Sequence, residues 1–338
     1  MGRSNIPENL CVKIYNGDLF RNHSTEITKS IDREYQALQE IDNPYIVRLI
    51  AMFKDIDEYG ELANVHLVLE KALPPSDGPK LINRPLEDRQ KYGGTGELFR
   101  YLVGRGTTTE GIARFIMFQL LAAVQCLHGK KPDPIVHRDL KTENAVVFGE
   151  LSTSAGLVPR IKLTDFGTAR HIPVQALIMD KAILTAEQGS PQYIAPELII
   201  PVMNNNNKTT TSSTTLSSSS SQSNNNRRYI YNENVDIYSL GVTMFFIITF
   251  QYPYADNTGP ENNSWRDNLI NGNIQWHLID SLLSSSGKDL LRWMLQKNPT
   301  LRFSAEQCLS HRWFDPIREE VAVVFRDDTL RRYRRARM

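Results

Sequence analysis

The sequence lacks several features that would mark it as a particular class of protein. Its 338 residues hold only three cysteines, Cys11, Cys126 and Cys308, without Cys-x-x-Cys spacing or neighbouring histidines. This scarcity argues against a zinc site or a disulfide framework and favours a reducing compartment. The longest apolar run, at residues 239–250, is too short to cross a bilayer and is typical of a buried helix.

An excess of charge of one sign is also lacking, since the formal net charge is +1. This balance gives no reason to expect a nucleic acid or a membrane as partner. The first residues, MGRSNIPENL, have no apolar core of the kind that a secretory leader needs. Ile6 stands where a myristoylation signal beginning at Gly2 has Ser or Thr. We therefore expect a cytoplasmic or nuclear protein.

Most of the sequence has an ordinary globular composition, with 41% hydrophobic and 23% charged residues. The polar, proline-rich stretch 73–92 predicts an inserted loop. Residues 204–226, almost all Asn, Ser and Thr, predict a disordered insertion, with an interaction tract as the alternative. Elsewhere the apolar spacing is typical of strands or helices. Strands are predicted at 8–16, 46–53, 64–70 and within 145–165, and helices at 24–41, 96–103, 109–128 and from 235 to about 314.

The predicted helix at 24–41 carries a carboxylate on its apolar face. Ser24 or Thr25 is the expected cap. Glu34 lies on the apolar stripe, and a carboxylate that faces a core is costly unless a cation meets it. The alternative is a solvated helix residue, but the helical phase and a matching lysine in the preceding strand, Lys13, favour a buried pair. The apolar stripe consists of Ile27, Ile31, Leu38 and Ile41.

Three motifs follow in order along the chain: HRDLKTEN at 137–144, TDFG at 164–167 and SPQYIAPE at 190–197. Together with Lys13 and Glu34 they resemble the ordered motifs of the eukaryotic protein kinases, a resemblance that spans about residues 8 to 316. It implies an α+β protein kinase fold of two lobes. The expected parts are a truncated N-terminal β lobe at 1–72, a mainly helical C-terminal lobe at 73–316 and a basic tail at 317–338.

The resemblance implies a role for each residue of these motifs. Asp139 would accept the proton of the attacking hydroxyl or orient it, and Lys141 would stabilise the transferred phosphate. Asn144 and Asp165 would hold Mg²⁺ through oxygen atoms. Lys13 would bind the α- and β-phosphates of ATP, while Glu34 holds Lys13 in place. The other residues that the resemblance places around ATP are Cys11, Glu70, Ala72 and Val146.

Two further features are expected to stabilise the fold rather than to take part in the chemistry. Asp236 resembles the family residue that anchors the catalytic loop from a buried helix. Glu197 and Arg302 resemble a long-range ion pair of the family. Breaking such a buried pair by removing one partner typically costs about 3–5 kcal/mol.

The motifs resemble those of serine/threonine kinases, because Lys141 follows Asp139 by two residues and Ser190 stands where that type places a hydroxyl. Residues 289–314 resemble the calcium/calmodulin-dependent group. Glu97 and Glu143 match positions that face arginines of basic protein substrates in related kinases. For Glu97, an acid favoured by the N-terminus of a helix is the alternative.

Regulation is expected near Arg138, because kinases with an arginine before the catalytic aspartate often need a phosphate or an acid on the activation segment. Thr185 is the nearest candidate, and Glu187 could supply a fixed charge instead. The basic tail, with Phe325, Leu330 and Tyr333 interleaved, could bind calmodulin or act as an autoinhibitory helix. A solvated basic end is the alternative.

One part of the family pattern is missing from the sequence. Kinases place a glycine-rich loop, which covers the phosphates, before the strand lysine, but here only MGRSNIPENLCV precedes Lys13. Three explanations remain: a truncated record of an active kinase, a real short form, or a kinase-like scaffold with impaired catalysis. The presence of Lys13, Asp139 and Asp165 favours the first.

Overall fold

The computed structural model describes residues 10–60, 62–72, 96–106, 108–173, 190–199, 232–254 and 264–325. The predicted loop at 73–92, the predicted disordered insertion at 204–226 and Thr185 lie outside these ranges.

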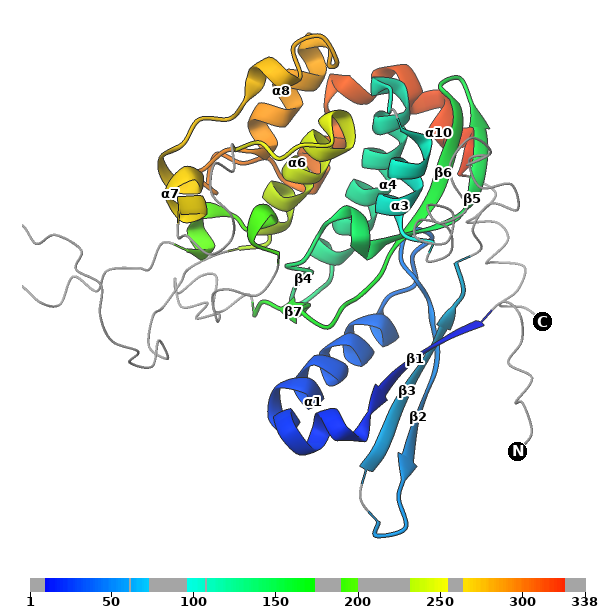
Figure 1. The fold of residues 1–338 in the computed structure, drawn as a ribbon. Coiled ribbons are helices and arrows are strands. Elements are labelled where there is room, and N and C mark those ends of the chain that lie inside the picture. Colours follow the sequence, from blue (N-terminus) through cyan, green and yellow to red (C-terminus); the bar gives the residue numbers. More distant parts are fainter. Residues whose placement is uncertain are drawn as a thin grey trace, which may run out of the picture.

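The N-terminal part is a three-stranded antiparallel sheet with one long helix packed against it (Figure 1). The strand order is β1-β3-β2, and Leu67 of the central strand pairs with Lys13 on one side and with Met52 on the other. Because side chains alternate along a strand, Cys11, Lys13 and Tyr15 share one face of β1. The elements are β1 (Leu10–Asn16), α1 (Gly17–Glu40), β2 (Leu49–Ile56) and β3 (Leu62–Glu70).

Helix α1 differs from its prediction at its start. It begins at Gly17, directly after β1, so Ser24 and Thr25 lie inside the helix and the predicted cap is wrong. No glycine or proline occurs between residues 18 and 43, so nothing in the sequence interrupts the helix earlier. It ends before Pro44, as expected of the residues that precede a proline.

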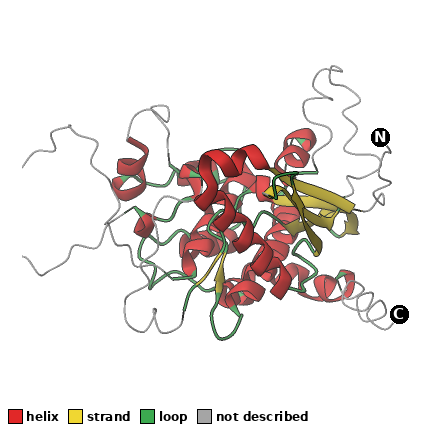
Figure 2. Ribbon diagram, turned by 90° about the horizontal axis from the view of Figure 1, so that it is seen from below, coloured by secondary structure: helices red, strands yellow, loops and turns green. Residues whose placement is uncertain are grey.

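The larger part of the molecule is mainly helical (Figure 2). Its core is built around α4 and α6, both of which are largely buried. Helix α4 is long and apolar enough to cross a membrane, but the buried core helix of a soluble protein also meets these criteria of length and composition. The described helices of this part are α3 (Leu98–Arg105), α4 (Glu110–His128), α6 (Asn234–Thr249), α7 (Ser264–Asn271), α8 (Ser285–Met294), α9 (Ala305–Ser310) and α10 (Arg318–Val324), with short 3-10 turns η2 (Thr142–Asn144), η3 (Pro191–Tyr193), η4 (Pro196–Leu198), η5 (Trp276–Leu278) and η6 (Arg312–Ile317).

Two small antiparallel sheets in this part contain the strands that directly precede two of the predicted motifs, those at 137–144 and 164–167. Strands β5 (Ala145–Thr153) and β6 (Gly156–Leu163) form a hairpin in which Ala145 pairs with Leu163. The pair β4 (Ile135–Val136) and β7 (Arg170–His171) lies between the two parts of the molecule (Figure 1). The described residues thus form an α+β fold, and the predicted strands and helices are confirmed within a few residues, except for the start of α1.

The linker after α1 joins the two parts. The backbone N–H of Val47 donates to the Leu163 carbonyl at 2.9 Å, and the N–H of Leu163 donates to the Tyr45 carbonyl at 2.7 Å. The ring of Tyr45 also contacts Phe325 after α10, with ring centroids 5.5 Å apart. Phe325, the first of the three apolar residues in the predicted regulatory tail, is buried, while Leu330 and Tyr333 lie outside the described residues. Burial against two other rings, including the stacked ring of Phe118, stabilises Phe325 there.

Candidate active site

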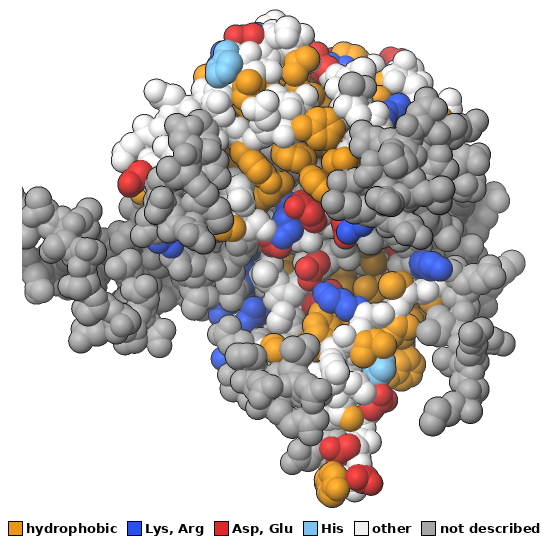
Figure 3. Space-filling view, in the orientation of Figure 1, with side chains coloured by type: hydrophobic (Ala, Val, Ile, Leu, Met, Phe, Trp, Pro, Cys, Tyr) orange, Lys and Arg blue, Asp and Glu red, His pale blue; other side chains and the backbone are white. Residues whose placement is uncertain are grey.

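Charged side chains of both signs gather in the middle of the face shown in Figure 3, between the sheet and the helical part. Three of the predicted residues, Lys13, Glu34 and Asp165, are in contact with one another through the lysine. The Nζ of Lys13 lies 2.8 Å from Oε2 of Glu34 and 3.1 Å from Oδ1 of Asp165. Glu34 is fully buried, whereas the side chain of Asp165 is 48% exposed. The lysine therefore joins α1 to the segment that follows β6.

The electrostatics of this cluster keep Lys13 and Asp165 charged. Burial alone would lower the pKa of Lys13, but the Glu34 and Asp165 carboxylates outweigh it and raise that pKa above its ordinary value. Partial burial would raise the pKa of Asp165, but the Lys13 ammonium holds it below the usual range. A fixed cation and a partly open carboxylate thus lie side by side at neutral pH.

A second cluster is centred on Asp139. Oδ2 of Asp139 lies 2.8 Å from Nζ of Lys141 and accepts a hydrogen bond of 2.8 Å from Nδ2 of Asn144. Its other oxygen, Oδ1, accepts a hydrogen bond of 3.1 Å from the backbone N–H of Ser190. Lys141 also donates to Oγ of Ser190 at 2.7 Å. These contacts fix the Asp139 carboxylate from three sides.

The hairpin β5–β6 brings the two clusters together. Asn144 directly precedes β5 and Asp165 follows β6 by two residues, and the strand ends are paired. The N–H of Thr164 donates to the carbonyl of Asn144 at 2.9 Å, which places the residue before Asp165 beside Asn144. Two oxygen-bearing side chains, predicted as metal ligands, therefore come from adjacent strand ends.

A buried carboxylate holds the loop in front of Asp139. Asp236, fully buried on α6, accepts hydrogen bonds from the backbone N–H groups of His137 at 2.9 Å and Arg138 at 2.8 Å. Nε2 of His128 lies 3.0 Å from the same carboxylate. Arg138 itself has a φ of 68°, a strained value for a residue with a side chain. The predicted anchoring of the catalytic loop by Asp236 is confirmed.

The second predicted structural pair is confirmed as well. Nη1 of Arg302 lies 2.6 Å from Oε1 of Glu197, and the arginine side chain is fully buried. Arg302 also donates to the carbonyl oxygens of Gln296 and Asn234, at 2.8 Å and 2.9 Å. The guanidinium is therefore fully surrounded by acceptors.

The residues predicted around the adenine lie near the end of β3. Cys11 is exposed and pairs with Leu69, while Val146 is half-buried on β5. Ala72 approaches Gly96, where an added Cβ would stand 3.2 Å from the alanine Cβ. The carboxylate of Glu70 pairs with Nζ of Lys162 at 2.5 Å, so it is not available as a ligand of the nucleotide. A contribution of Glu70 to nucleotide binding is thus left to its backbone.

The two acids predicted to face a basic substrate have different surroundings. Glu97 stands before α3 without capping it, and its carboxylate pairs with Arg100 at 3.2 Å. Glu143 lies in η2 and accepts a hydrogen bond of 2.9 Å from the Thr142 hydroxyl. Burial and the nearby Glu143 carboxylate raise the pKa of Tyr193. Of the two acids, Glu97 is the one with a basic partner among the described residues.

Residues 5–314 match the sequence profile of the protein kinase domain. The chain belongs to the protein kinase domain family. Its relatives include the meiosis-specific serine/threonine-protein kinase mek1 of Schizosaccharomyces pombe, which is 34% identical over 65% of this chain and 41% of that protein. The probable serine/threonine-protein kinase fhkA of Dictyostelium discoideum is 29% identical over 93% of this chain and 46% of that protein.

This kinase domain spans less than half the length of these two relatives. Its fold is similar to that in the crystal structure of the Rad53 kinase domain and SCD2 in complex with AMPPNP, with a TM-score of 0.55 and 20% identity. That match covers 90% of this chain and 81% of the other. The predicted fold, a two-lobed α+β protein kinase, is confirmed by the family match and by this likeness.

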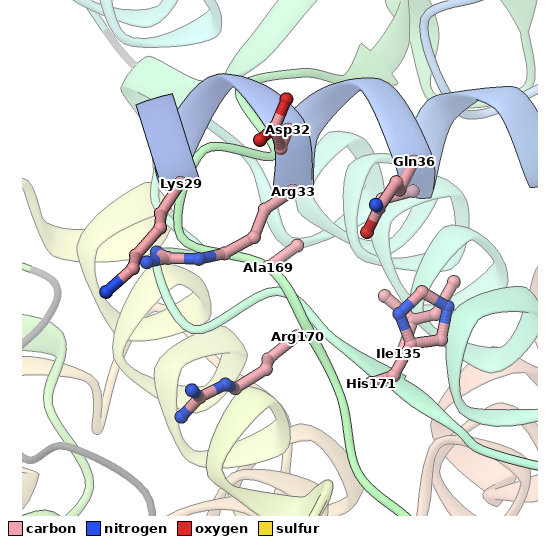
Figure 4. Close-up of a pocket in the computed structure, with 9 residues that line it drawn as sticks. Lys29, Asp32, Arg33, Gln36, Ile135, Ala169, Arg170 and His171 are labelled. Atoms are coloured by element: carbon pink, nitrogen blue, oxygen red, sulfur yellow. The ribbon is translucent and has the colours of Figure 1, made fainter. Parts of the chain in front are cut away.

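A basic cavity of about 390 Å³ lies on the other side of α1 in this kinase domain, between the helix and β7. Lys29, Arg33 and Arg170 extend toward the same side of it, while Asp32 points away (Figure 4). Arg33 donates to the Gly167 carbonyl at 3.3 Å. Arg138 donates to the next carbonyl, that of Thr168, at 2.7 Å, so the two arginines reach the same segment. Of the four basic residues Lys29, Arg33, Arg138 and Arg170, only Arg138 was predicted from the sequence.

Two residues that pair with predicted site residues of this kinase domain were also missed in the sequence. Tyr15 donates a hydrogen bond of 2.5 Å from its hydroxyl to Oε2 of Glu34. The two-residue spacing from Lys13 was a signal, because it predicts the same face of the strand. Lys162, three residues before Asp165, carries no such local signal, since its partner Glu70 is distant in the sequence.

Proposed function

We propose that this kinase domain transfers the γ-phosphate of ATP to serine or threonine hydroxyls of protein substrates. The observation that carries the proposal is the Asp139 carboxylate, fixed by Lys141, Asn144 and Ser190 beside the Asp165 segment. Phosphoryl transfer needs mainly positioning and charge neutralisation, and this arrangement provides both.

The described residues fit ATP with Mg²⁺. The NH₂ of Asn144 donates to Asp139. No described residue donates to the Oδ1 of Asn144, which suits that oxygen to a hard cation. Asp165 is partly exposed and would be the second ligand. No group of three or more His, Cys, Asp or Glu side chains forms a metal site in the described part of the chain. Mg²⁺ commonly uses one or two carboxylates together with phosphate and water oxygens, so this is no obstacle. When bound, Mg²⁺ and ATP supply the transferable phosphoryl group with its charge partly neutralised.

Each residue of the chain then has a defined task. Lys13, held by Glu34, would bind nucleotide phosphates. Asp139 would accept the hydroxyl proton of the substrate or orient that hydroxyl. Lys141, 2.8 Å from Asp139, would neutralise charge on the phosphoryl group as it moves. Cys11, Val146 and the backbone of Glu70 and Ala72 would surround the adenine.

We extend the proposal to substrate preference. Glu143 would face a basic residue of the substrate, since none of its described contacts supplies a cation. Glu97 would take part only if the substrate displaced Arg100. A peptide library is expected to show selection for arginine N-terminal to the acceptor hydroxyl, and the selection should weaken in Glu143→Gln. A library without that selection refutes this part of the proposal. Membership of the calcium/calmodulin-dependent group rests on residues 289–314 alone.

Regulation would act through the basic cavity beside α1. A phosphate on Thr185, or the Glu187 carboxylate, would meet Arg138 and the cations of the cavity, Arg33 and Arg170. Thr185→Ala is expected to lower activity and Thr185→Glu to restore part of it. Equal activity of the wild type and Thr185→Ala, with Thr185 phosphorylated in the wild type, contradicts this role.

The experiment that tests the proposed function measures transfer of labelled γ-phosphate from Mg-ATP to an arginine-containing peptide. The full chain and its Asp165→Ala variant are compared, with circular dichroism as the check on folding. We expect transfer by the wild type and none by the variant. A well-folded wild type that binds a Mg-ATP analogue but transfers nothing would favour the alternative, a kinase-like scaffold.

A further inference from the structure

Tyr15 shares the buried carboxylate of Glu34 with the lysine of the site. Its hydroxyl donates to Oε2 of Glu34 at 2.5 Å, and Nζ of Lys13 lies 2.8 Å from the same oxygen. Lys13 also donates to Oε1 at 3.1 Å. Glu34 thus has two partners on one face of β1, one cationic and one neutral.

The cationic partner has competing duties. Lys13 already divides its ammonium between Glu34 and Asp165, and nucleotide phosphates would be a third acceptor for it while Glu34 holds it in place. Glu34 is 0% exposed, so water cannot replace a partner that moves away. A buried carboxylate that loses its partners is strongly destabilised, because its charge remains desolvated.

The neutral partner is suited to remain. Burial and the Glu34 carboxylate both raise the pKa of Tyr15, so the phenol keeps its proton at neutral pH and stays a donor. The strand β1 fixes its backbone through pairing of Tyr15 with Val65. Its hydrogen bond therefore holds the Glu34 carboxylate while the ammonium of Lys13 is shared with phosphate.

We propose that Tyr15 is a positioning residue for phosphoryl transfer: its hydroxyl holds the Glu34 carboxylate against β1 while Lys13 binds the phosphates of a nucleoside triphosphate. The inference rests on the proposed function and deepens it. It predicts that loss of the hydroxyl weakens nucleotide binding and leaves the binding of the protein substrate unchanged.

The chain offers a matched control in Tyr101. Its hydroxyl donates to Oε1 of Glu150 at the same distance, 2.5 Å, and burial and that hydrogen bond raise its pKa as well. This second pair joins α3 to β5 and includes none of the residues assigned to the active site. Tyr101→Phe thus removes a comparable tyrosine–glutamate hydrogen bond without touching Lys13 or Glu34.

The test compares the full chain with Tyr15→Phe, Tyr101→Phe, Glu34→Gln and Tyr15→Phe/Glu34→Gln. Affinity for a non-hydrolysable Mg-ATP analogue is measured by titration, and KM for ATP and for peptide by phosphate transfer. We expect Tyr15→Phe to weaken analogue binding and raise KM for ATP by about tenfold, the effect of one hydrogen bond to a charged group. KM for peptide should not change, and Tyr101→Phe should change neither constant.

The double variant distinguishes positioning from a merely structural role. If Tyr15 acts through Glu34, Tyr15→Phe/Glu34→Gln binds the analogue as weakly as Glu34→Gln alone. Losses that add, or wild-type affinity in Tyr15→Phe, overturn the inference while the proposed function stands. A wild type that neither binds the analogue nor transfers phosphate overturns both.

Discussion

Replacing Asp236 by Asn tests how the fold holds the catalytic loop. The carboxylate accepts from the N–H groups of His137 and Arg138 with different oxygens, and Nε2 of His128 lies 3.0 Å from Oδ2, the oxygen that accepts from His137. An amide has only one oxygen. In either orientation of the Asn side chain, its NH₂ group faces a buried backbone N–H. The more favourable orientation keeps the amide oxygen toward His137 and His128.

The expected loss follows from these three contacts. The N–H of Arg138 is left without an acceptor, which costs about 1–3 kcal/mol for a buried donor. The remaining bonds change from charged to neutral, which weakens each by roughly 1 kcal/mol. We expect Asp236→Asn to lower the free energy of unfolding by about 3–5 kcal/mol, a large share of the roughly 5–15 kcal/mol that stabilises a typical domain.

Urea unfolding of the full chain gives the stability change, and phosphate transfer below the unfolding transition gives kcat. Thr243→Val is the control, because it removes one buried hydrogen bond of 2.9 Å on the same helix, to the Ser239 carbonyl. It should cost about 1 kcal/mol and leave kcat unchanged. Asp236→Asn should also lower kcat, since Arg138 precedes Asp139. A loss no larger than that of Thr243→Val, or an unchanged kcat, refutes the reasoning.

Three other predictions concern stability and thiol reactivity. Glu197→Leu should lower the free energy of unfolding by about 3–5 kcal/mol because it leaves the fully buried Arg302 cation unpaired. Arg302→Met should cost less free energy of unfolding in the Glu197→Leu variant than in the wild type. Additive losses in urea unfolding contradict this coupling. Gly241→Ala would bring a Cβ to 2.8 Å from Leu295 Cδ2, so we expect the free energy of unfolding to fall by about 1–3 kcal/mol in the same assay. An unchanged midpoint would show that α8 shifts without cost. Iodoacetamide should modify the exposed Cys11 in the folded chain but not Cys308, whose pKa burial raises to about 12. Mg-ATP should slow the reaction of Cys11, as measured by mass spectrometry of peptides, and an unprotected Cys11 contradicts its place beside the nucleotide.

Local periodicity accounts for the elements that could be predicted from the sequence. The helical phase placed Glu34 on an apolar face, and the structure buries it against Lys13. The start of α1 was missed because Ser24 and Thr25 are good caps, yet nothing between Gly17 and them stops a helix. Capping preference is a local bias that a continuous helix from β1 overrides.

Contacts between distant segments depend on other information. Asp236 and the Glu197–Arg302 pair were predicted through the resemblance, since their partners lie far away in the sequence. The burial of Phe325 against Tyr45 was not predictable from the basic tail, because the composition of the tail suggests solvent. Phe325 is buried only because α10 ends beside the linker that follows α1.

A comparison of the wild type with Asp139→Asn shows whether the cluster around Asp139 is the active site. Analogue titration measures nucleotide binding, and single-turnover transfer of γ-phosphate to a serine peptide measures the chemistry. We expect nearly equal analogue affinity, because Lys13 and Asp165 remain, and a loss of transfer of at least about a hundredfold, the usual contribution of a general base. Transfer by Asp139→Asn at the wild-type rate would contradict the assignment of the active site.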